Sequence, residues 1–190
     1  NISILLIILT LTVTNFYNIY KNVKYEKYIT KEIYETLGSF AMSVKTSQEE
    51  DDTLLNVINS KTVNKQQIVF LESRYHYYRQ LLQSYRDIVI LLEKDSIIEE
   101  LNNSIATIDL INSYIFNLKK DLNSENTFFL KNENLLKFNE INKLDNYMYQ
   151  QVINFKKLNT LNFYDIKNNN WMHLSQQLLT FPNNIFSKTE

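Results

Sequence analysis

Residues 62–93 read TVNKQQIVFLESRYHYYRQLLQSYRDIVILLE, and this segment decides the fold. Counted as heptads, its a and d positions are all apolar or aromatic, whereas the opposite f positions are all polar. The a and d residues are Ile68, Leu71, Tyr75, Tyr78, Leu82, Tyr85, Val89 and Leu92. This period predicts a long helix with one buried stripe. Further apolar residues at Ile88, Ile90 and Leu91 widen the stripe, so we expect the C-terminal end of this helix to lie deepest.

The composition favours an all-α fold. The 190 residues include one glycine and one proline, whereas turn-rich β folds depend on both residue types. A formal net charge of −1 gives no electrostatic reason to expect nucleic acid as a partner. The absence of cysteine excludes disulfides and thiolate catalysis.

Residues 1–20 are predicted to form a single transmembrane anchor. They contain no charged residue, and about 20 apolar residues are needed to cross a bilayer as a helix. Tyr17 and Tyr20 fall where an interfacial aromatic belt would lie, and Lys21, Lys24 and Lys27 follow as the flank in water. The partner of this segment would be membrane lipid. The lysines could contact anionic headgroups, but the glutamates among them favour an ordinary solvated flank.

Two other interpretations of the first segment remain open. A signal peptide would end in small residues at its cleavage site, and none is present here. A buried core helix is the third interpretation, and it predicts a chain that needs no detergent. The sequence does not begin with methionine, so residues upstream could be missing. We expect the bundle on the extracytoplasmic side, although the lysine flank by itself favours the cytoplasmic side.

Residues 21–181 are predicted to form an antiparallel bundle of about four long helices with coiled-coil-like packing, and residues 182–190 a tail. The first helix continues beyond the lysines, with Gly38 inside it at a site of close packing. Acidic residues 46–52 are expected to form a loop before a short helix over 54–58. Later helices are expected over 97–122, 133–161 and 171–179. The capping-box pair Ser96 and Glu99 opens the first of these, and Asn170 caps the last. The aromatic segment 128–130 should cover the bundle end.

Few residues are suited to catalysis or metal binding. Glu72 and His76 stand one helical turn apart, a spacing that could hold a metal, but both lie at the rim of the heptad pattern. His173 is the only other histidine. A single glycine excludes a glycine-rich phosphate loop. We therefore expect no enzymatic activity and no cofactor.

Arginine and tyrosine are concentrated on the heptad helix, as they are in protein-binding hot spots. The candidate partner-binding residues are Arg74, Tyr75, Tyr78, Arg79 and Arg86, together with Trp171 in the last helix. The alternative, which we favour, is internal packing, with Arg79 and Arg86 paired to carboxylates of neighbouring helices and the tyrosines in the core.

The sequence thus suggests a membrane-anchored, non-enzymatic subunit that binds other proteins or associates with itself. A ligand-sensing extracytoplasmic bundle is the alternative, and it predicts a polar pocket near Arg74 and Arg79. An enzyme would require inward-facing carboxylates that the sequence does not single out.

Overall fold

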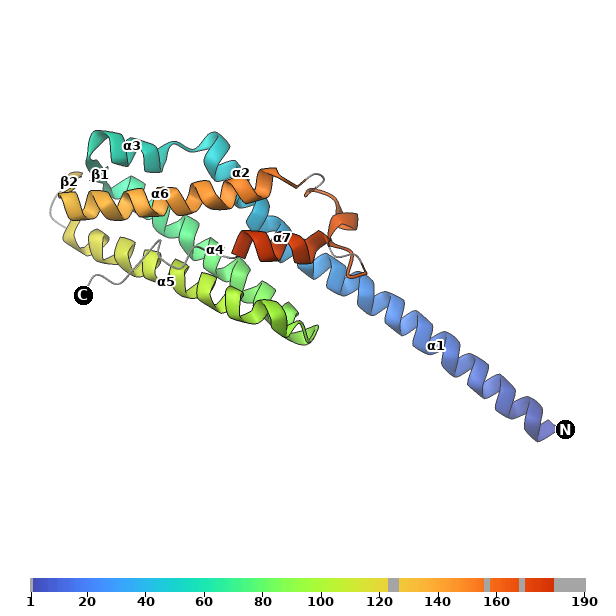
Figure 1. The fold of residues 1–190 in the computed structure, drawn as a ribbon. Helices are drawn as coiled ribbons and strands as arrows, with labels where there is room; N and C mark the ends of the chain where they lie inside the picture. The colour runs from blue at the N-terminus through green and yellow to red at the C-terminus, as the bar shows by residue number, and fades with distance from the viewer. Residues whose placement is uncertain (1, 123–126, 156–157, 168–169, 180–190) are drawn as a thin grey trace.

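The computed structural model is a bundle of antiparallel helices from which the first helix projects (Figure 1). It describes residues 2–122, 127–155, 158–167 and 170–179, with side chains in the first helix from residue 7 onward. The long helices are α1 (Ile2–Ile33), α2 (Ser39–Glu50), α4 (Lys65–Leu91), α5 (Ile98–Asp121) and α6 (Asn132–Ile153). The short ones are α3 (Thr53–Ser60) and α7 (Asn170–Leu179). The π-helical turn η1 (Tyr34–Gly38) joins α1 to α2 in one continuous rod, so four long rods make the bundle and the predicted helical architecture is confirmed.

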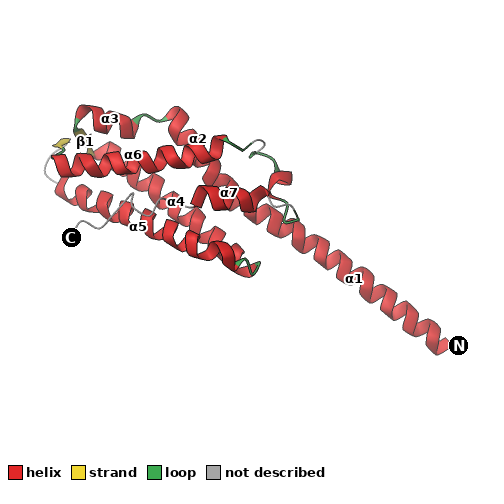
Figure 2. Ribbon diagram, viewed as in Figure 1, coloured by secondary structure: helices red, strands yellow, loops and turns green. Residues whose placement is uncertain are grey.

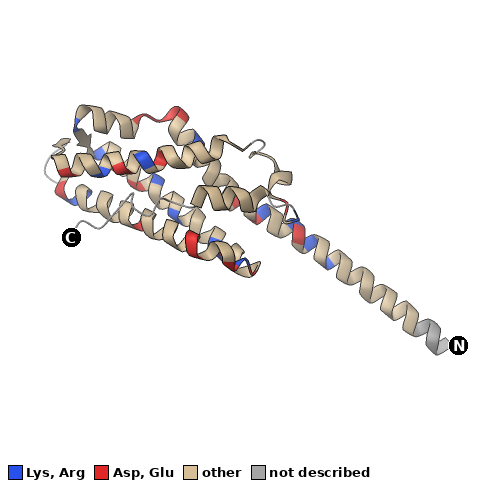
Figure 3. Cartoon of the chain, in the orientation of Figure 1, with Lys and Arg blue, Asp and Glu red and all other residues tan. Residues whose placement is uncertain are grey.

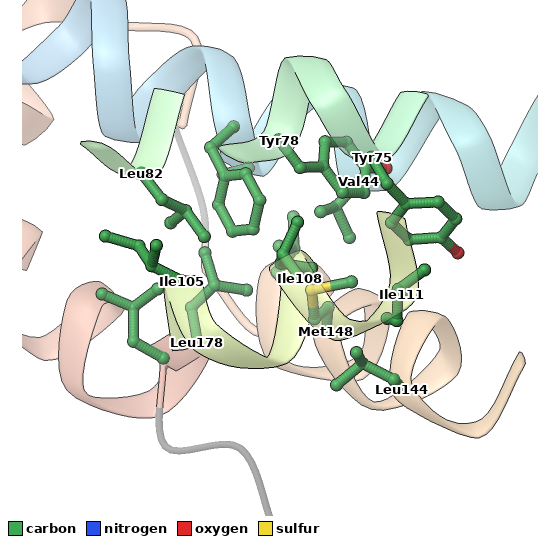
Figure 4. Packing of buried hydrophobic residues seen from close by; sticks show 14 of the residues in the cluster. Val44, Tyr75, Tyr78, Leu82, Ile105, Ile108, Ile111, Leu144, Met148 and Leu178 are labelled. Atoms are coloured by element: carbon green, nitrogen blue, oxygen red, sulfur yellow. The ribbon is translucent and has the colours of Figure 1, made fainter. Parts of the chain in front are cut away.

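The heptad stripe of α4 lies in the centre of the bundle. Seven of its eight residues are at most 1% exposed, and Leu92 is partly buried. Figure 4 shows Tyr75, Tyr78 and Leu82 facing residues of α5, α6 and α7. These facing residues are Ile105, Ile108, Ile111, Leu144, Met148 and Leu178. Each such side chain stabilises the fold by about 1.5–3 kcal/mol when fully buried, so this stripe contributes substantially to stability.

The end of α4 differs from the prediction that it lies deepest. Ile88 and Val89 are buried, but Ile90 and Leu91 are 51% and 57% exposed. The helix stops at the edge of the bundle, where Lys94 N–H donates to the Val89 carbonyl at 3.1 Å and Glu93 adopts a left-handed φ of 54°. This is the bonding pattern of a Schellman cap. Among the described residues, no helix covers the side chains of Ile90 and Leu91 in this last turn.

The helix caps are only partly as predicted. At the start of α4, Asn64 Oδ1 accepts from Gln67 N–H and Gln67 Oε1 accepts from Asn64 N–H, both at 2.9 Å. The predicted capping box of Ser96 and Glu99 is wrong, because the 3-10 turn η2 (Asp95–Ile97) leads into α5 without a side-chain cap. Asn170, which was expected to cap the last helix, is the first residue of α7.

A two-stranded ribbon corrects the expectation of a purely helical chain. Strand β1 (Thr62–Asn64) pairs with β2 (Thr127–Phe129) in antiparallel register at the bundle end (Figure 2). β-branched and aromatic residues favour an extended backbone, and helices on both sides stop before these residues. Leu130 is buried and Phe128 partly buried, so they cover the bundle end as expected, whereas Phe129 is 78% exposed.

The remaining helix boundaries shift by several residues. The acidic segment 46–52 is mostly helical, because α2 continues to Glu50. Helix α6 ends at Ile153, well before the expected residue 161, and the 3-10 turn η4 (Leu161–Tyr164) follows. Gly38 is closely packed as predicted: a Cβ atom there would lie 3.0 Å from Tyr164 Cζ. The predicted tail, residues 182–190, lies outside the described residues.

Helix α1 leaves the bundle and projects as a single rod (Figure 1). Figure 3 shows that the described part of its outer half carries no charged residue and that charges begin near the bundle. Within the described part of the chain, which omits the side chains of residues 1–6, no helix is long and apolar enough to cross a membrane. The predicted transmembrane anchor over residues 1–20 is therefore not supported by this criterion.

Candidate functional site

A charged cluster is buried between α4, α6 and the end of α2. Arg74 forms an ion pair with Asp51, which follows α2, and its Nη1 lies 3.4 Å from Asp145 Oδ2 on α6. The side chains of Arg74 and Asp145 are 5% and 2% exposed. The guanidinium also lies 5.1 Å from the centre of the Phe70 ring, a cation–π distance. The cluster ties three segments together that are far apart in the sequence.

Two tyrosines of the heptad stripe extend this cluster. Tyr75 donates its hydroxyl to Asp145 Oδ2 at 2.7 Å, and Tyr78 donates to Ser47 Oγ at 3.0 Å. Their rings pack edge to face at 5.7 Å. Burial is the main reason that the pKa of each tyrosine hydroxyl is raised, so both remain protonated donors at neutral pH.

The Asp145 carboxyl is the unusual ionisable group of the cluster. Burial raises its pKa to about 6, although Arg74 and the Tyr75 hydroxyl both favour the charged form. Its Oδ1 and the Nε of Arg74 have no hydrogen-bond partner among the described residues. The cluster therefore combines one buried cation with two carboxylates. Chemically, it can hold the helices in register and take up a proton in mild acid.

The outer face of α4 pairs with α5 through surface ions. Arg79 donates to Asp109 and, at 2.8 Å, to Gln83 Oε1, while Lys119 donates to Glu72. Glu72, Arg79 and Asp109 border an open hollow of about 510 Å³ together with His76. The Glu72 carboxylate is thus paired with Lys119. No group of three potential metal ligands occurs within the described ranges of the chain.

Trp171 lies inside the bundle and fixes α7 to its neighbours. It is 1% exposed and packs edge to face against Tyr85 of α4, with ring centres 6.5 Å apart. The Tyr85 hydroxyl is hydrogen-bonded to Ser175, and Ser104 of α5 donates to the Leu179 carbonyl at 2.6 Å. Tyr85 and Trp171 therefore belong to the core contacts of α7.

The structure divides the predicted partner-binding residues into two groups. It buries Arg74, Tyr75, Tyr78 and Trp171. Arg79 and Arg86 remain partly exposed, and Arg86 Nη2 lies 3.6 Å from its neighbour Asp87. Contact with a protein partner stays a prediction, and of the six candidate residues only these two arginines reach the surface in this conformation.

Sequence reasoning missed Asp51 and Asp145. Asp145 had a recognisable signal, because it lies among the residues that form the apolar stripe of α6, which are Ile141, Leu144, Met148 and Val152. A carboxylate at such a position requires a buried partner. Asp51 had no comparable signal, since it follows a run of exposed acidic residues.

A second candidate site lies where α1 leaves the bundle. A half-open cleft of about 770 Å³ separates α1 from the segment around η4. Ile166 N–H donates to Thr30 Oγ1 at 3.3 Å, and the Lys167 amine lies 2.7 Å from a Glu26 carboxylate oxygen. The predicted membrane-flank residues, which are Tyr17, Tyr20, Lys21, Lys24 and Lys27, are all exposed on α1.

The fold and these sites define an antiparallel helical bundle with a buried ion cluster and a projecting apolar helix. Comparison of the chain with protein-family models, curated proteins and solved structures finds no match. Its function is therefore inferred from the ion cluster, the cleft beside α1 and the exposed side chains of α1.

Proposed function

We propose that the chain is a non-enzymatic, membrane-anchored subunit whose helical bundle binds other proteins outside the bilayer. The observation that carries this proposal is the exposure of the outer half of α1. Its large apolar side chains are between 58% and 69% exposed. They are Ile7, Ile8, Leu9, Leu11, Val13, Phe16, Tyr17, Ile19 and Tyr20.

Lipid is the environment that best buries the exposed apolar side chains of this helix. Burying each aliphatic side chain is worth about 1.5–3 kcal/mol, so six of them together favour a covered state by of order 10 kcal/mol. They lie on every side of the helix, which a single flat protein surface would not cover. The hydroxyls of Thr12 and Thr14 donate to the carbonyls of Ile8 and Thr10 at 2.8 Å. These bonds within the helix give both hydroxyl groups a hydrogen-bond partner, which surrounding hydrocarbon cannot provide.

The bundle end nearest to the projecting helix supports the same arrangement. The turn between α4 and α5 lies at this end (Figure 1) and carries the exposed Ile90 and Leu91. Leu161 on η4, beside α1, is 47% exposed. Lys21, Lys24 and Lys27 follow the apolar half of α1 at the level where lysine would meet headgroups and water. These residues would touch the membrane surface when α1 is inserted.

The opposite end of the bundle offers a surface for a protein partner. An open hollow there is lined by Val69, Phe70 and Thr127, next to the start of α4. Phe70 is 48% exposed, and Leu136 on α6 is 65% exposed. Exposed aromatic and aliphatic side chains are typical of contact surfaces. A second copy of the chain or another protein would cover them.

Flotation of the full chain with phosphatidylcholine vesicles tests the membrane anchor. We expect the protein to float and to resist extraction by high salt, because the attachment is apolar rather than ionic. The variant Leu11→Arg should float to a smaller extent, since a charge in the middle of the apolar half costs about 2.5–3.5 kcal/mol. Leu136→Arg, an equally exposed position on the bundle, should float like the unmodified chain. An unmodified chain that stays at the bottom would refute membrane anchoring.

A ligand-sensing bundle is the second candidate, favoured by the open hollow beside Arg79. Arg79 borders it together with Glu72, His76 and Asp109. Succinate and free glutamate are suitable probes because a carboxylate would compete with Asp109 for the guanidinium. A rise in melting temperature with either probe that Arg79→Gln abolishes would support sensing. Equal melting temperatures with and without both probes would argue against sensing of this ligand class.

A further inference from the structure

The cleft at the base of α1 has balanced charge. Its basic residues are Lys27, Lys31 and Lys167, and its acidic residues are Glu26, Glu35 and Asp165. The two signs are equal in number, and two ion pairs already link them, Lys167 with Glu26 and Lys31 with Glu35. A simple anion entering the cleft would face three carboxylates. A zwitterion can instead place its negative charge beside the lysines of the cleft and its positive charge beside the carboxylates.

The cleft begins at the depth of lipid headgroups if the apolar half of α1 lies in the bilayer. From Tyr20, the last residue of the uncharged segment, the helix rises by about 4.5 Å to Val23, the first residue that lines the cleft, and by about 9 Å to Glu26. The headgroup layer on each side of a bilayer is about 5–8 Å thick. Val23 then lies within the headgroup layer and Glu26 at its outer edge. Val23, which lines the same end of the cleft and is 43% exposed, then lies closer to the hydrocarbon than Glu26 and Lys27.

We propose that this cleft binds the headgroup of a zwitterionic phospholipid, with the phosphate at Lys27 and Lys167 and the ammonium at Glu26 and Asp165. This proposal rests on the proposed membrane anchor. The phosphate replaces Glu26 as the partner of Lys167, and the ammonium then takes the freed carboxylate. An ethanolamine headgroup fits best, because its N–H groups can donate to both carboxylates. Val23 and Leu161 border the cleft with the apolar surface that the glycerol end of the lipid requires.

The test uses the full chain in maltoside micelles, which contain no phosphate. Dihexanoyl phosphatidylethanolamine is added below its own micelle concentration, and its phosphorus resonance is followed by NMR. We expect the resonance to broaden and shift on binding. The double variant Lys27→Gln with Lys167→Gln should weaken binding at least tenfold, whereas Lys143→Gln, an exposed lysine on α6, should not. Circular dichroism checks that each variant keeps its helix content.

Other probes separate the possible sources of the effect. Inorganic phosphate alone should bind much more weakly, and dihexanoyl phosphatidylglycerol, which has no ammonium, should bind more weakly too. Equal binding of either probe would overturn a zwitterionic lipid site, as would an unchanged affinity of the double variant or no response from the unmodified chain. Because micelle measurements do not depend on insertion into vesicles, flotation without headgroup binding would refute this site alone. Headgroup binding without flotation would refute the anchor and leave a lipid-binding cleft.

Discussion

The buried carboxyl of Asp145 predicts that this fold becomes less stable as the pH rises from about 4 to 7. Its pKa is about 6 in the folded chain, against an ordinary value of 3.8. Between these values the folded state binds more protons than the unfolded state, so the free energy of unfolding falls with rising pH. The stabilisation is complete below about pH 4 and is lost as the pH passes 6. Two pKa units correspond to about 3 kcal/mol.

The substitution Asp145→Asn isolates this effect. Asparagine resembles the protonated carboxyl and can still accept the Tyr75 hydroxyl bond, while Arg74 keeps its ion pair with Asp51. We therefore expect equal stability of the two chains near pH 4. At pH 7 the asparagine variant should be more stable by about 3 kcal/mol, which for a chain of this size raises the melting temperature by about 6–12 °C.

The assay is thermal unfolding of the full chain in maltoside, followed by circular dichroism at 222 nm across a pH series. Asp109→Asn is the matched control, because it removes a partly exposed carboxylate that pairs with Arg79. The control should keep the decline in stability between pH 4 and 7, and Asp145→Asn should lack it. A variant that is less stable than the unmodified chain at pH 7 would show that the charged pair with Arg74 outweighs the cost of burial.

Three further predictions concern a close contact, a helix cap and the side of the membrane. Gly38→Ala should lower stability by about 1–3 kcal/mol, because the new methyl group meets the Tyr164 ring and overpacking outweighs the gain in helix propensity. Adding Tyr164→Leu should recover part of the loss, and a Gly38→Ala chain with an unchanged melting temperature would contradict the contact. Asn64→Ala should cost about 1 kcal/mol in urea unfolding by removing the capping box of α4, and Asn146→Ala on the exposed face of α6 is its control. An unchanged urea midpoint for Asn64→Ala would show that the cap contributes little. Phe129→Cys gives the chain a single thiol at an exposed site, which a membrane-impermeant maleimide should label in intact cells if the bundle is extracytoplasmic. Labelling only after the cells are opened would place the bundle inside.

Periodicity in the sequence was enough to predict much of the bundle. The heptad stripe of α4 predicted seven of its buried residues, because a helix with one apolar face can only be stable with that face covered. The same reasoning predicted α5, α6 and α7 and the close packing at Gly38. It was less accurate at helix ends, where α2 and α6 stop several residues away from their expected positions. Local composition does not show how far a neighbouring helix extends to cover the last turn.

For the candidate sites, the sequence identified residues that take part but not the residues that they contact. It singled out Arg74, Tyr75 and Tyr78, yet whether they face solvent or the core depends on which helices surround them. Arg74 meets Asp145, 71 residues later, only because α4 and α6 pack together. The cleft beside Lys27 likewise exists only because η4 returns to the base of α1.

The sequence by itself determined the helical class of this protein, the buried face of its central helix and the apolar character of its first segment, since these follow from the order and spacing of side chains along one helix. The tertiary structure decided which charges meet inside the bundle, how the β1–β2 ribbon closes its end and where the cleft beside α1 forms. Those features depend on contacts between segments far apart in the chain, and periodicity within a segment carries no information about which distant segment will pack against it.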